Sequence, residues 1–307
     1  MARRRRGLPV NGVLLLDKPS GVSSNHALQR ARRLLQAQKA GHTGTLDPMA
    51  TGLLPLCFGE ATKFAAHLLE ADKVYRTRVE LGRVTDTGDA EGEVVARREV
   101  PPLNATDIEG VLARFRGEIE QVPPMHSALK HQGRKLYELA REGKTIARAA
   151  RRVRVYDARL LACESEAFEL EVRVSKGTYI RTLAEDIGQV LGCGAHISAL
   201  RRLATGPFAA ADGMLSLEAL EALPDQVARE AALLPADVLV AHLPRLDAEA
   251  SAAQRLTHGQ PARLATAGLA SGETARLYRD GTFLGLVTVT APQEVAPKRL
   301  CSTAVAQ

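Results

Sequence analysis

The sequence predicts an α+β fold for most of the chain, followed by a small β-rich domain. Residues 73–82, KVYRTRVELG, alternate apolar and polar side chains, which is the pattern of a half-buried strand. Residues 24–38 instead place apolar side chains at helical spacing, behind a Ser-Ser-Asn run that can cap a helix. After about Pro244, short apolar stretches are separated by Gly and Asp-Gly turns, which indicates a separate β-rich unit.

The other elements are expected from the same signals. GVLLLDK predicts a short strand that ends in a turn at Pro19-Ser20-Gly21, and Thr106 is a candidate cap for a helix over 107–116. Residues 130–152 predict a helix–turn insertion, and Arg279-Asp280-Gly281 predicts a hairpin. Further helices are expected at 61–70, from about Ile180, at 216–223 and at 226–233; further strands are expected after 84–95, before SKGTY and after LGCG.

Composition places the chain among folded proteins. Its 307 residues allow one large or two modest domains, and 45% of them are hydrophobic. The sequence contains no run of about 18 apolar residues, so no membrane span is predicted. The N-terminal apolar run VLLL is too short for the hydrophobic region of a signal peptide, so a cytoplasmic location is expected. The four cysteines are scattered without zinc-site spacing, so we expect reduced thiols and no metal site.

Positive charge is concentrated in two stretches. The net charge is +6, yet residues 130–154 alone hold nine lysines and arginines against two glutamates, and Arg3–Arg6 form a basic run in a tail expected to be flexible. A concentrated basic segment favours a polyanion partner such as RNA or DNA. A solvated helix face without a partner gives the same charge pattern, so charge alone leaves both interpretations open.

The glycine-rich segment GHTGTLDPMATG, residues 41–52, holds a single carboxylate, Asp47. Its spacing matches neither phosphate-binding glycine motif, and a hydrolase triad lacks its GxSxG turn and has His42 only five residues from Asp47. Two interpretations remain open from these residues. Asp47 either caps the turn or is a catalytic carboxylate on a loop whose glycines let a substrate approach.

Six sequence blocks carry a family resemblance. GVLLLDKPSGVSSN, AGHTGTLDPMATGLLPLCFGEATKF, DKVYR, LGRVTDTGDAEG, SKGTYIRTLAEDIG and GCGAHISALRR resemble, in order and spacing, the TruB family of bacterial tRNA pseudouridine-55 synthases. The resemblance implies the pseudouridine-synthase fold, a large mixed, mainly antiparallel sheet flanked by helices. It places this domain at 9–243, with a basic lid insertion at 123–152, and a PUA-like RNA-binding domain at 244–307.

The resemblance also implies a reaction and its residues. Such enzymes isomerise uridine 55 in the T-loop of tRNA to pseudouridine, flip the base out of the loop, and use no cofactor or metal. Asp47 matches the catalytic aspartate, which attacks C1′ of the ribose or stabilises its departure. Arg181 matches the arginine that pairs with this aspartate. Tyr75 matches the tyrosine that stacks on the flipped uracil and assists proton transfer.

Other positions match residues that contact the substrate or support the site. Tyr179 and Leu200 match positions that line the uracil pocket, and His42 matches the residue that fills the space of the flipped base. The remaining matched or lid positions expected to contact RNA or to support the site are Lys63, Asp89, Lys18, Lys130, Arg134, Arg141 and Lys144. In PPMHSALK, His126 stands where many relatives have a tyrosine.

Two other functions fit the same blocks. Relatives that depend on a guide RNA usually carry long basic extensions, whereas this chain has only a short arginine tail, so a stand-alone enzyme without guide RNA, and a monomer, is expected. A non-catalytic protein that binds or folds tRNA is the other alternative. The complete set of Asp47, Tyr75 and Arg181 argues against it.

Overall fold

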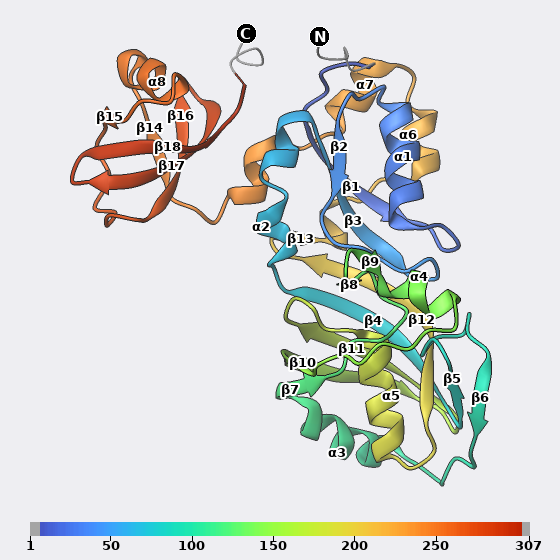
Figure 1. Ribbon diagram of the computed structural model, residues 1–307. Coiled ribbons are helices and arrows are strands. Elements are labelled where there is room, and N and C mark those ends of the chain that lie inside the picture. Colours follow the sequence, from blue (N-terminus) through green and yellow to red (C-terminus); the bar gives the residue numbers. More distant parts are fainter. Residues whose placement is uncertain (1–6, 303–307) are drawn as a thin grey trace.

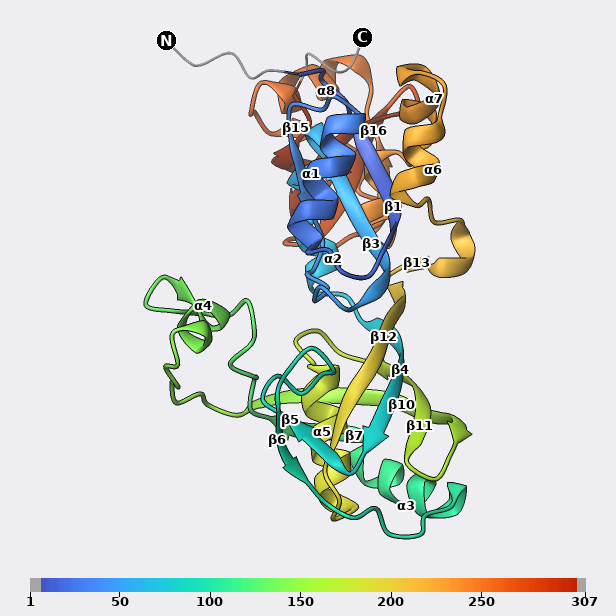
Figure 2. The same cartoon turned by 90° about the vertical axis from the view of Figure 1, so that its right-hand side faces the viewer.

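The computed structural model describes residues 7–302 and has two parts (Figure 1). The Arg3–Arg6 run, predicted to be a basic tail, lies outside the described residues. The larger part is built on one sheet, and Figure 2 shows β4 and β12 running between its two halves. The smaller part, with strands β14 to β18, lies beside one half in Figure 1. None of the helices in residues 7–302 combines the length and apolar character that a transmembrane helix requires.

The large sheet has nine strands and is mixed but mainly antiparallel. Its order is β1-β3-β12-β4-β11-β10-β7, with β2 paired to β3 and β13 paired to β12. Only the β3–β12 pair is parallel among these ladders. The predicted fold class is therefore confirmed. The strands are β1 Gly12–Lys18, β2 Ala40–His42, β3 Thr51–Phe58, β4 Lys73–Leu81, β7 Gly117–Gln121, β10 Arg151–Cys163, β11 Ala167–Val174, β12 Ala195–Thr205 and β13 Phe208–Ala209.

Most helices begin close to where the sequence predicts but end earlier or use other caps, whereas the helix predicted over 61–70 is instead a 3₁₀ turn followed by a four-residue helix. Helix α1, Ser24–Leu34, is capped by Ser23 and stops short of Gln38 because Gln36 adopts a φ of 50°. Helix α3, Ala105–Phe115, is capped by Asn104 in a capping box, so the predicted cap at Thr106 is wrong. Helix α5, Ile180–Val190, starts where predicted. The other helices of the larger part are α2 Ala66–Leu69, α4 Leu136–Arg141, α6 Leu217–Ala222 and α7 Gln226–Ala231, with 3₁₀ turns η1 Gly59–Lys63, η2 Ala210–Asp212 and η3 Ala236–Val240.

The basic insertion is more than a helix and a turn. It contains a small hairpin, β8 Lys130–His131 with β9 Arg134–Lys135, and then α4, which projects from the body of the molecule in Figure 2. Residues 151 and 152, placed in the insertion from the sequence, already belong to β10 and pair with β7. A second separate hairpin is formed by β5 Arg83–Thr85 and β6 Val94–Arg97.

The smaller part has its own sheet and core. Its strands, in the order β14-β16-β17-β18-β15, surround a separate cluster of buried apolar side chains. The predicted hairpin is present, with Asp280 at φ 50° and Gly281 at φ 77° between β16 and β17, as a two-residue turn of this hand requires. Its elements are β14 Arg245–Asp247, α8 Ala250–Thr257, β15 Ala262–Arg263, β16 Thr274–Arg279, β17 Thr282–Ala291 and β18 Glu294–Leu300.

Candidate active site

The loop that carries Asp47 is fastened from several sides. The hydroxyl of Ser24, at the start of α1, accepts from the Leu46 N–H at 2.8 Å and donates to the Leu46 carbonyl at 2.9 Å. Gly44 has a φ of +100°, a conformation that glycine adopts without strain. The Asp47 carbonyl accepts from the Ala50 N–H at 3.1 Å and closes the turn. Its backbone is therefore placed by contacts on both sides, before any substrate arrives.

Lys18 supports the same loop from β1. Its side chain is fully buried, and its ammonium group donates to the carbonyls of Pro19, Val22 and Pro48 at 2.8, 2.6 and 3.1 Å. Burial lowers the pKa of Lys18 to about 8, although the nearby Asp47 carboxylate raises it. Lys18 thus ties the residue after Asp47 to the end of β1, which fits the supporting role predicted for it.

A buried arginine, Arg181, joins two aspartates, Asp47 and Asp89. Arg181, on the first turn of α5, lies 2.9 Å from an Asp47 carboxylate oxygen and 3.5 Å from an Asp89 carboxylate oxygen. The Arg181 side chain is 4% exposed and that of Asp89 7%, whereas that of Asp47 is 37% exposed. Only Asp47 of the three therefore presents its charged group to a molecule arriving from solvent.

The charges around Asp47 oppose one another. Burial raises the pKa of the Asp47 carboxyl above its usual value, and the negative charge of Asp89 raises it further. Arg181 and Lys18 lower it, but the net direction of the shift in the Asp47 pKa is upward. One side of the carboxylate stays open while protein atoms enclose the other, so the ion is only partly hydrated and its attraction to Arg181 is strengthened.

Arg181 is held in place by backbone groups that the sequence did not point to. Its guanidinium group donates to the carbonyl of Thr87 at 2.7 Å and to the carbonyl of His126, at the root of the basic insertion, also at 2.7 Å. The buried amide of Gln121 grips the backbone of Tyr179, accepting from its N–H at 3.1 Å and donating to its carbonyl at 3.3 Å. Carbonyl ligands leave no residue-type signature, which is why sequence reasoning missed them.

A third carboxyl group stands behind the arginine. Glu185 follows Arg181 by one helical turn, and burial raises its pKa to about 7, with Arg181 opposing the shift and Asp186 and Asp89 adding to it. Its carboxyl group packs against Gly88, where a Cβ would come within 3.0 Å of the Glu185 Cδ. Gly88 also has a φ of +74°, so any other residue would be strained at this turn next to Asp89.

The other predicted pocket residues come from strands next to this loop. Tyr75 on β4 and Leu200 on β12 belong to one hydrophobic cluster with Leu46, next to Asp47 in the chain. The Thr51 hydroxyl meets the Leu200 carbonyl at 3.5 Å and so links β3 to β12. His42 ends β2, and its Nδ1 is buried with no hydrogen-bond partner among the described residues. Burial and then the charge of Arg202 lower the pKa of His42, which favours a neutral ring at neutral pH.

The four predicted phosphate-binding side chains of the insertion are all exposed, but they are not equally free. Arg134 and Lys144 both pair with the carboxylate of Glu142, the latter at 2.9 Å. The Arg141 guanidinium stacks over the Tyr137 ring at 5.5 Å. Lys130 lies on β8 and projects into solvent.

Lys63 lies at the joint between the two parts of the molecule instead of in the group around Arg181. Its ammonium group pairs with Glu60 at 2.6 Å and donates to the carbonyl of Leu300 at 2.9 Å. Nearby, the rings of Phe64 and Phe283 meet edge to face at 5.2 Å between centroids. Lys63 therefore holds the smaller domain against the larger one, a role that the sequence did not predict. Its predicted contact with RNA stays a prediction.

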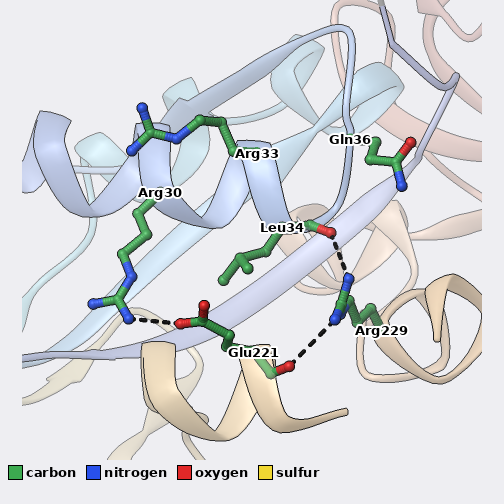
Figure 3. A pocket seen from close by; sticks show the side chains of 6 residues that line it. All are labelled: Arg30, Arg33, Leu34, Gln36, Glu221 and Arg229. Carbon is green, nitrogen blue, oxygen red and sulfur yellow. Dashed lines mark hydrogen bonds and ion pairs between the residues drawn. The ribbon is translucent and has the colours of Figure 1, made fainter. Parts of the chain in front are cut away.

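A separate cavity of about 390 Å³ lies between α1, α6 and α7 (Figure 3). Three of its four charged side chains have partners: Arg30 pairs with Glu221 at 2.8 Å, and Arg229 donates to the carbonyls of Leu34 and Glu221 at 3.2 Å each. The side chain of the fourth, Arg33, has no hydrogen bond or ion pair among residues 7–302. This cavity includes none of the residues predicted for the site. We interpret it as a gap between helices that are joined by ion pairs.

Known proteins match the whole described chain. The family model for the N-terminal domain of the TruB family of pseudouridylate synthases matches residues 32–180. Models for the C-terminal domain of tRNA pseudouridylate synthase B and for the C-terminal region of pseudouridine synthase II TruB match 181–241 and 244–301. A protein from Chromohalobacter salexigens, named tRNA pseudouridine synthase B, is 71% identical over 304 residues, which cover 99% of this chain and 98% of that protein.

The chain belongs to the TruB family. A second relative of the same name, from Azoarcus, is 55% identical and covers 97% of both chains. The TruB chain is therefore a pseudouridine synthase, which is an isomerase. The resemblance inferred from the six sequence blocks is confirmed.

Solved structures agree with the fold of this TruB protein. A crystal structure of a Cbf5-Nop10-Gar1 complex matches with a TM-score of 0.70 at 28% identity, covering 95% of this chain and 85% of that one. An H/ACA ribonucleoprotein bound to a substrate RNA containing 2′-deoxyuridine matches with a TM-score of 0.72 at 25% identity, covering 98% and 91%. Both alignments extend over the larger and the smaller part, so the two-part architecture is shared.

Proposed function

We propose that this TruB protein converts uridine 55 in the T-loop of tRNA to pseudouridine, with Asp47 as its catalytic carboxylate. The observation that carries the proposal is the 2.9 Å pair between Asp47, which is open to solvent, and the buried Arg181. A partner of fixed position favours the ionised form of Asp47 and points its free oxygen outward. The substrate follows from the names of the relatives, which are tRNA pseudouridine synthases.

The reaction is an exchange of one bond for another. The bond between N1 of uracil and C1′ of the ribose breaks, and its electron pair leaves with the uracil. The Asp47 carboxylate either attacks C1′ and forms an ester or stabilises the positive charge that develops there. The detached ring turns until C5 faces C1′, a new C1′–C5 bond forms, the hydrogen on C5 is released as a proton, and N1 gains a proton.

The residues around Asp47 are suited to hold the base during this turn. The target uridine must leave the stacked loop, which costs a few kcal/mol of stacking that contacts in the pocket offset. Tyr75 offers its ring to the flipped uracil and its hydroxyl to the proton transfer at C5. Tyr179 and Leu200 line the uracil pocket. His42, neutral and with a free Nδ1, occupies the position left by the base.

The lid and the smaller domain extend the contact beyond the reacting nucleotide. Lys130, Arg134, Arg141 and Lys144 are exposed on the insertion and suit the phosphates of the T-arm. Asp89 fixes Arg181 from the side away from the substrate. The tRNA is the only partner in this proposal: no guide RNA and no second copy of the chain is required.

The test is an assay of tritium release from tRNA that carries uridine labelled at C5. Asp47→Asn removes the charge and keeps the shape of the side chain, so turnover should be abolished while tRNA affinity stays within a few fold. Asp280→Asn is the matched control, because asparagine fits the φ of 50° at this hairpin position and the residue is far from Arg181 in the fold. Substantial turnover by Asp47→Asn would refute the assignment of Asp47.

The likeness to the Cbf5 and H/ACA structures makes a guide-RNA-dependent enzyme the second candidate. The purified chain alone, mixed with a T-arm hairpin, separates the two. Release of tritium without any added RNA or protein supports the stand-alone enzyme. Release only after a guide RNA is added would support the second candidate.

A further inference from the structure

A second buried arginine packs against the loop that carries Asp47. Arg202 lies on β12, and it is only 1% exposed. In the ladder between β12 and β4, Arg202 is paired with Tyr75, and the preceding Arg201 is paired with Arg76. Paired residues on adjacent strands point to the same face of a sheet, and successive residues point to opposite faces. Arg202 therefore shares the face of Tyr75, whereas Arg201 and Arg76 share the other face.

Arg202 holds both ends of the Asp47 loop. Its Nε donates to the Leu53 carbonyl at 2.7 Å, and its Nη2 donates to the Gly44 carbonyl at 3.3 Å. The backbone packs closely here as well, because a Cβ at Gly52 would come within 2.3 Å of the Arg202 carbonyl oxygen. Asp47 lies between the two bonded carbonyls in the chain. One planar guanidinium group thus sets the spacing across the base of the loop.

The charge of Arg202 has no counterion within ion-pair distance. No carboxylate of residues 7–302 lies within 4.0 Å of its guanidinium group, whereas the neighbouring Arg201 pairs with Asp17 at 2.8 Å. A guanidinium group keeps its charge in proteins, so this cation acts on ionisable groups near it. His42, two residues before Gly44, is such a group. Burial lowers the pKa of His42, and the charge of Arg202 lowers it further.

Other ionisable groups also surround β2, the strand that ends in His42. Those on α1, β3 and η1, which pack against β2, and on the segments that flank it are His26, Arg30, Arg32, Arg33, Lys39, Asp47, Cys57, Glu60 and Lys63. Among these groups and Arg202, it is Arg202 whose charge lowers the pKa of His42. The shielded Nδ1 of His42 has no hydrogen-bond partner in residues 7–302, so no acceptor of this part of the chain stabilises a charged ring.

We propose that Arg202 is a positioning residue for this enzyme, which fixes the backbone on both sides of Asp47 and presents His42 to the RNA as an uncharged ring. The inference rests on the proposed function, since that function gives Asp47 and His42 their roles. An uncharged imidazole can stack and accept a hydrogen bond in the same place, whereas a charged ring can only donate. One buried cation thus serves two groups of the same loop.

The titration of His42 in the free protein tests the charge of Arg202. Imidazole carbon resonances are followed by NMR from pH 4.5 to 8.5, and His42 is identified by the signal lost in His42→Gln. In the parent, His42 should titrate below its ordinary value of 6.5. Arg202→Gln should move this titration to higher pH, and Arg202→Lys, which keeps the charge, should stay closer to the parent. Arg76→Gln is the matched control and should not move it, because Arg76 is on the other face of the sheet, is 54% exposed and pairs with Glu169.

Tritium release tests the hold on the loop. At pH 8, where His42 is uncharged in every variant, Arg202→Gln should lower kcat by about tenfold or more, because a small displacement of Asp47 spoils its approach to the reacting atoms. Arg202→Lys should lose nearly as much, since a single nitrogen does not span the two carbonyls as the planar fork does. From pH 8 to pH 6, kcat/KM of Arg202→Gln should fall further relative to the parent. This further fall should be absent in a His42→Gln background, and Arg76→Gln should keep the parent values.

Each outcome supports the inference or overturns it. A His42 titration at or above 6.5 in the parent overturns it without any variant, so the test does not depend on the folding of Arg202→Gln. The same His42 titration in the parent and in folded Arg202→Gln, or an unchanged kcat, also overturns it. A loss of kcat without a pH-dependent part that requires His42 would make Arg202 purely structural and would overturn it too. If the parent releases no tritium, the proposed function is wrong and the role of Arg202 in the reaction falls with it, while the His42 titration still measures the effect of its charge.

Discussion

Arg181 places one nitrogen 2.9 Å from the Asp47 carboxylate and another 3.5 Å from the Asp89 carboxylate. One buried cation is thus shared between an acid that is partly exposed and an acid that is buried. Arg181 lowers the pKa of Asp47, whereas Asp89 raises it. Removing Arg181 should therefore raise the pKa of Asp47, whereas removing the charge of Asp89 should lower it.

Arg181→Met should move the low-pH limb of kcat/KM to higher pH. Without the guanidinium group, burial and Asp89 raise the pKa of Asp47 unopposed by Arg181, so a higher pH is needed to ionise it. The plateau of kcat/KM should fall by about 10²-fold or more, since an aimed electrostatic contact is lost. Tritium release measured from pH 5 to 9 gives both values. Arg181→Lys keeps the charge and should move the limb less; an unmoved limb in the methionine variant would contradict the pairing.

Asp89→Asn should move the same limb to lower pH. The amide oxygen can still accept from the Thr87 hydroxyl and the Glu91 N–H, which meet Asp89 Oδ1 at 2.7 and 3.1 Å, so the turn is kept while the charge is lost. Removing that charge lowers the pKa of Asp47. Asp86→Asn is the control, because Asp86 accepts from the Glu93 N–H in the same turn and does not pair with Arg181. A shift upward in Asp89→Asn would refute this electrostatic account.

Glu185→Gln should make the protein more stable at pH 8 than its parent, with a smaller difference at pH 5. The folded pKa of Glu185 is about 7 and the ordinary value is 4.5, so between these values the folded state holds a proton that the unfolded state has released. The folding stability contributed by Glu185 therefore falls as pH rises through this window, by at most about 3 kcal/mol. Glutamine does not titrate and lacks this decline.

Thermal unfolding of the two proteins at a series of pH values is the measurement for Glu185. The difference in Tm, variant minus parent, should grow from pH 5 to pH 8. Burial also raises the pKa of Asp186 to about 6, but Asp186 is present in both proteins. Its contribution to the pH dependence of Tm therefore cancels in the difference between variant and parent. Parallel curves of Tm against pH would show that Glu185 carries no such shift.

Asn104→Ala should lower stability by about 1 kcal/mol without changing tritium release at 25 °C. The Asn104 side chain accepts from the N–H groups of Thr106 and Asp107, while Asp107 reaches back to the Asn104 N–H at 2.9 Å. Thr106→Ala, at the cap predicted from the sequence, should cost only a few tenths of a kcal/mol, since Thr106 is inside the helix. Denaturant titration distinguishes the two, and an equal loss in both would argue against the capping box.

Local patterns predicted the parts of the structure that local interactions determine. The alternation in 73–82 gave β4 within one residue, and the Asp-Gly turn at 280–281 gave its hairpin, because side-chain period and backbone handedness act over a few residues. The early end of α1 was missed, since nothing in the residue type of Gln36 requires a positive φ.

The sequence predicted the side chains of the candidate site but not the backbone groups that hold them. Asp47 and Arg181 are conspicuous in their motifs, and the structure brings them together. The carbonyls of Thr87 and His126 that hold Arg181 carry no sequence signal, and neither does the bond from Lys63 to Leu300, which joins residues 237 positions apart. Such long-range backbone contacts exist only once the sheet has formed.

The contact between Arg181 and position 126 uses a main-chain oxygen. Arg181 can therefore form this hydrogen bond whatever side chain stands at position 126. Position 126 is free to diversify while the anchor persists. Insertions exchanged between relatives should accordingly keep Arg181 in the same place, whatever residue they bring to position 126.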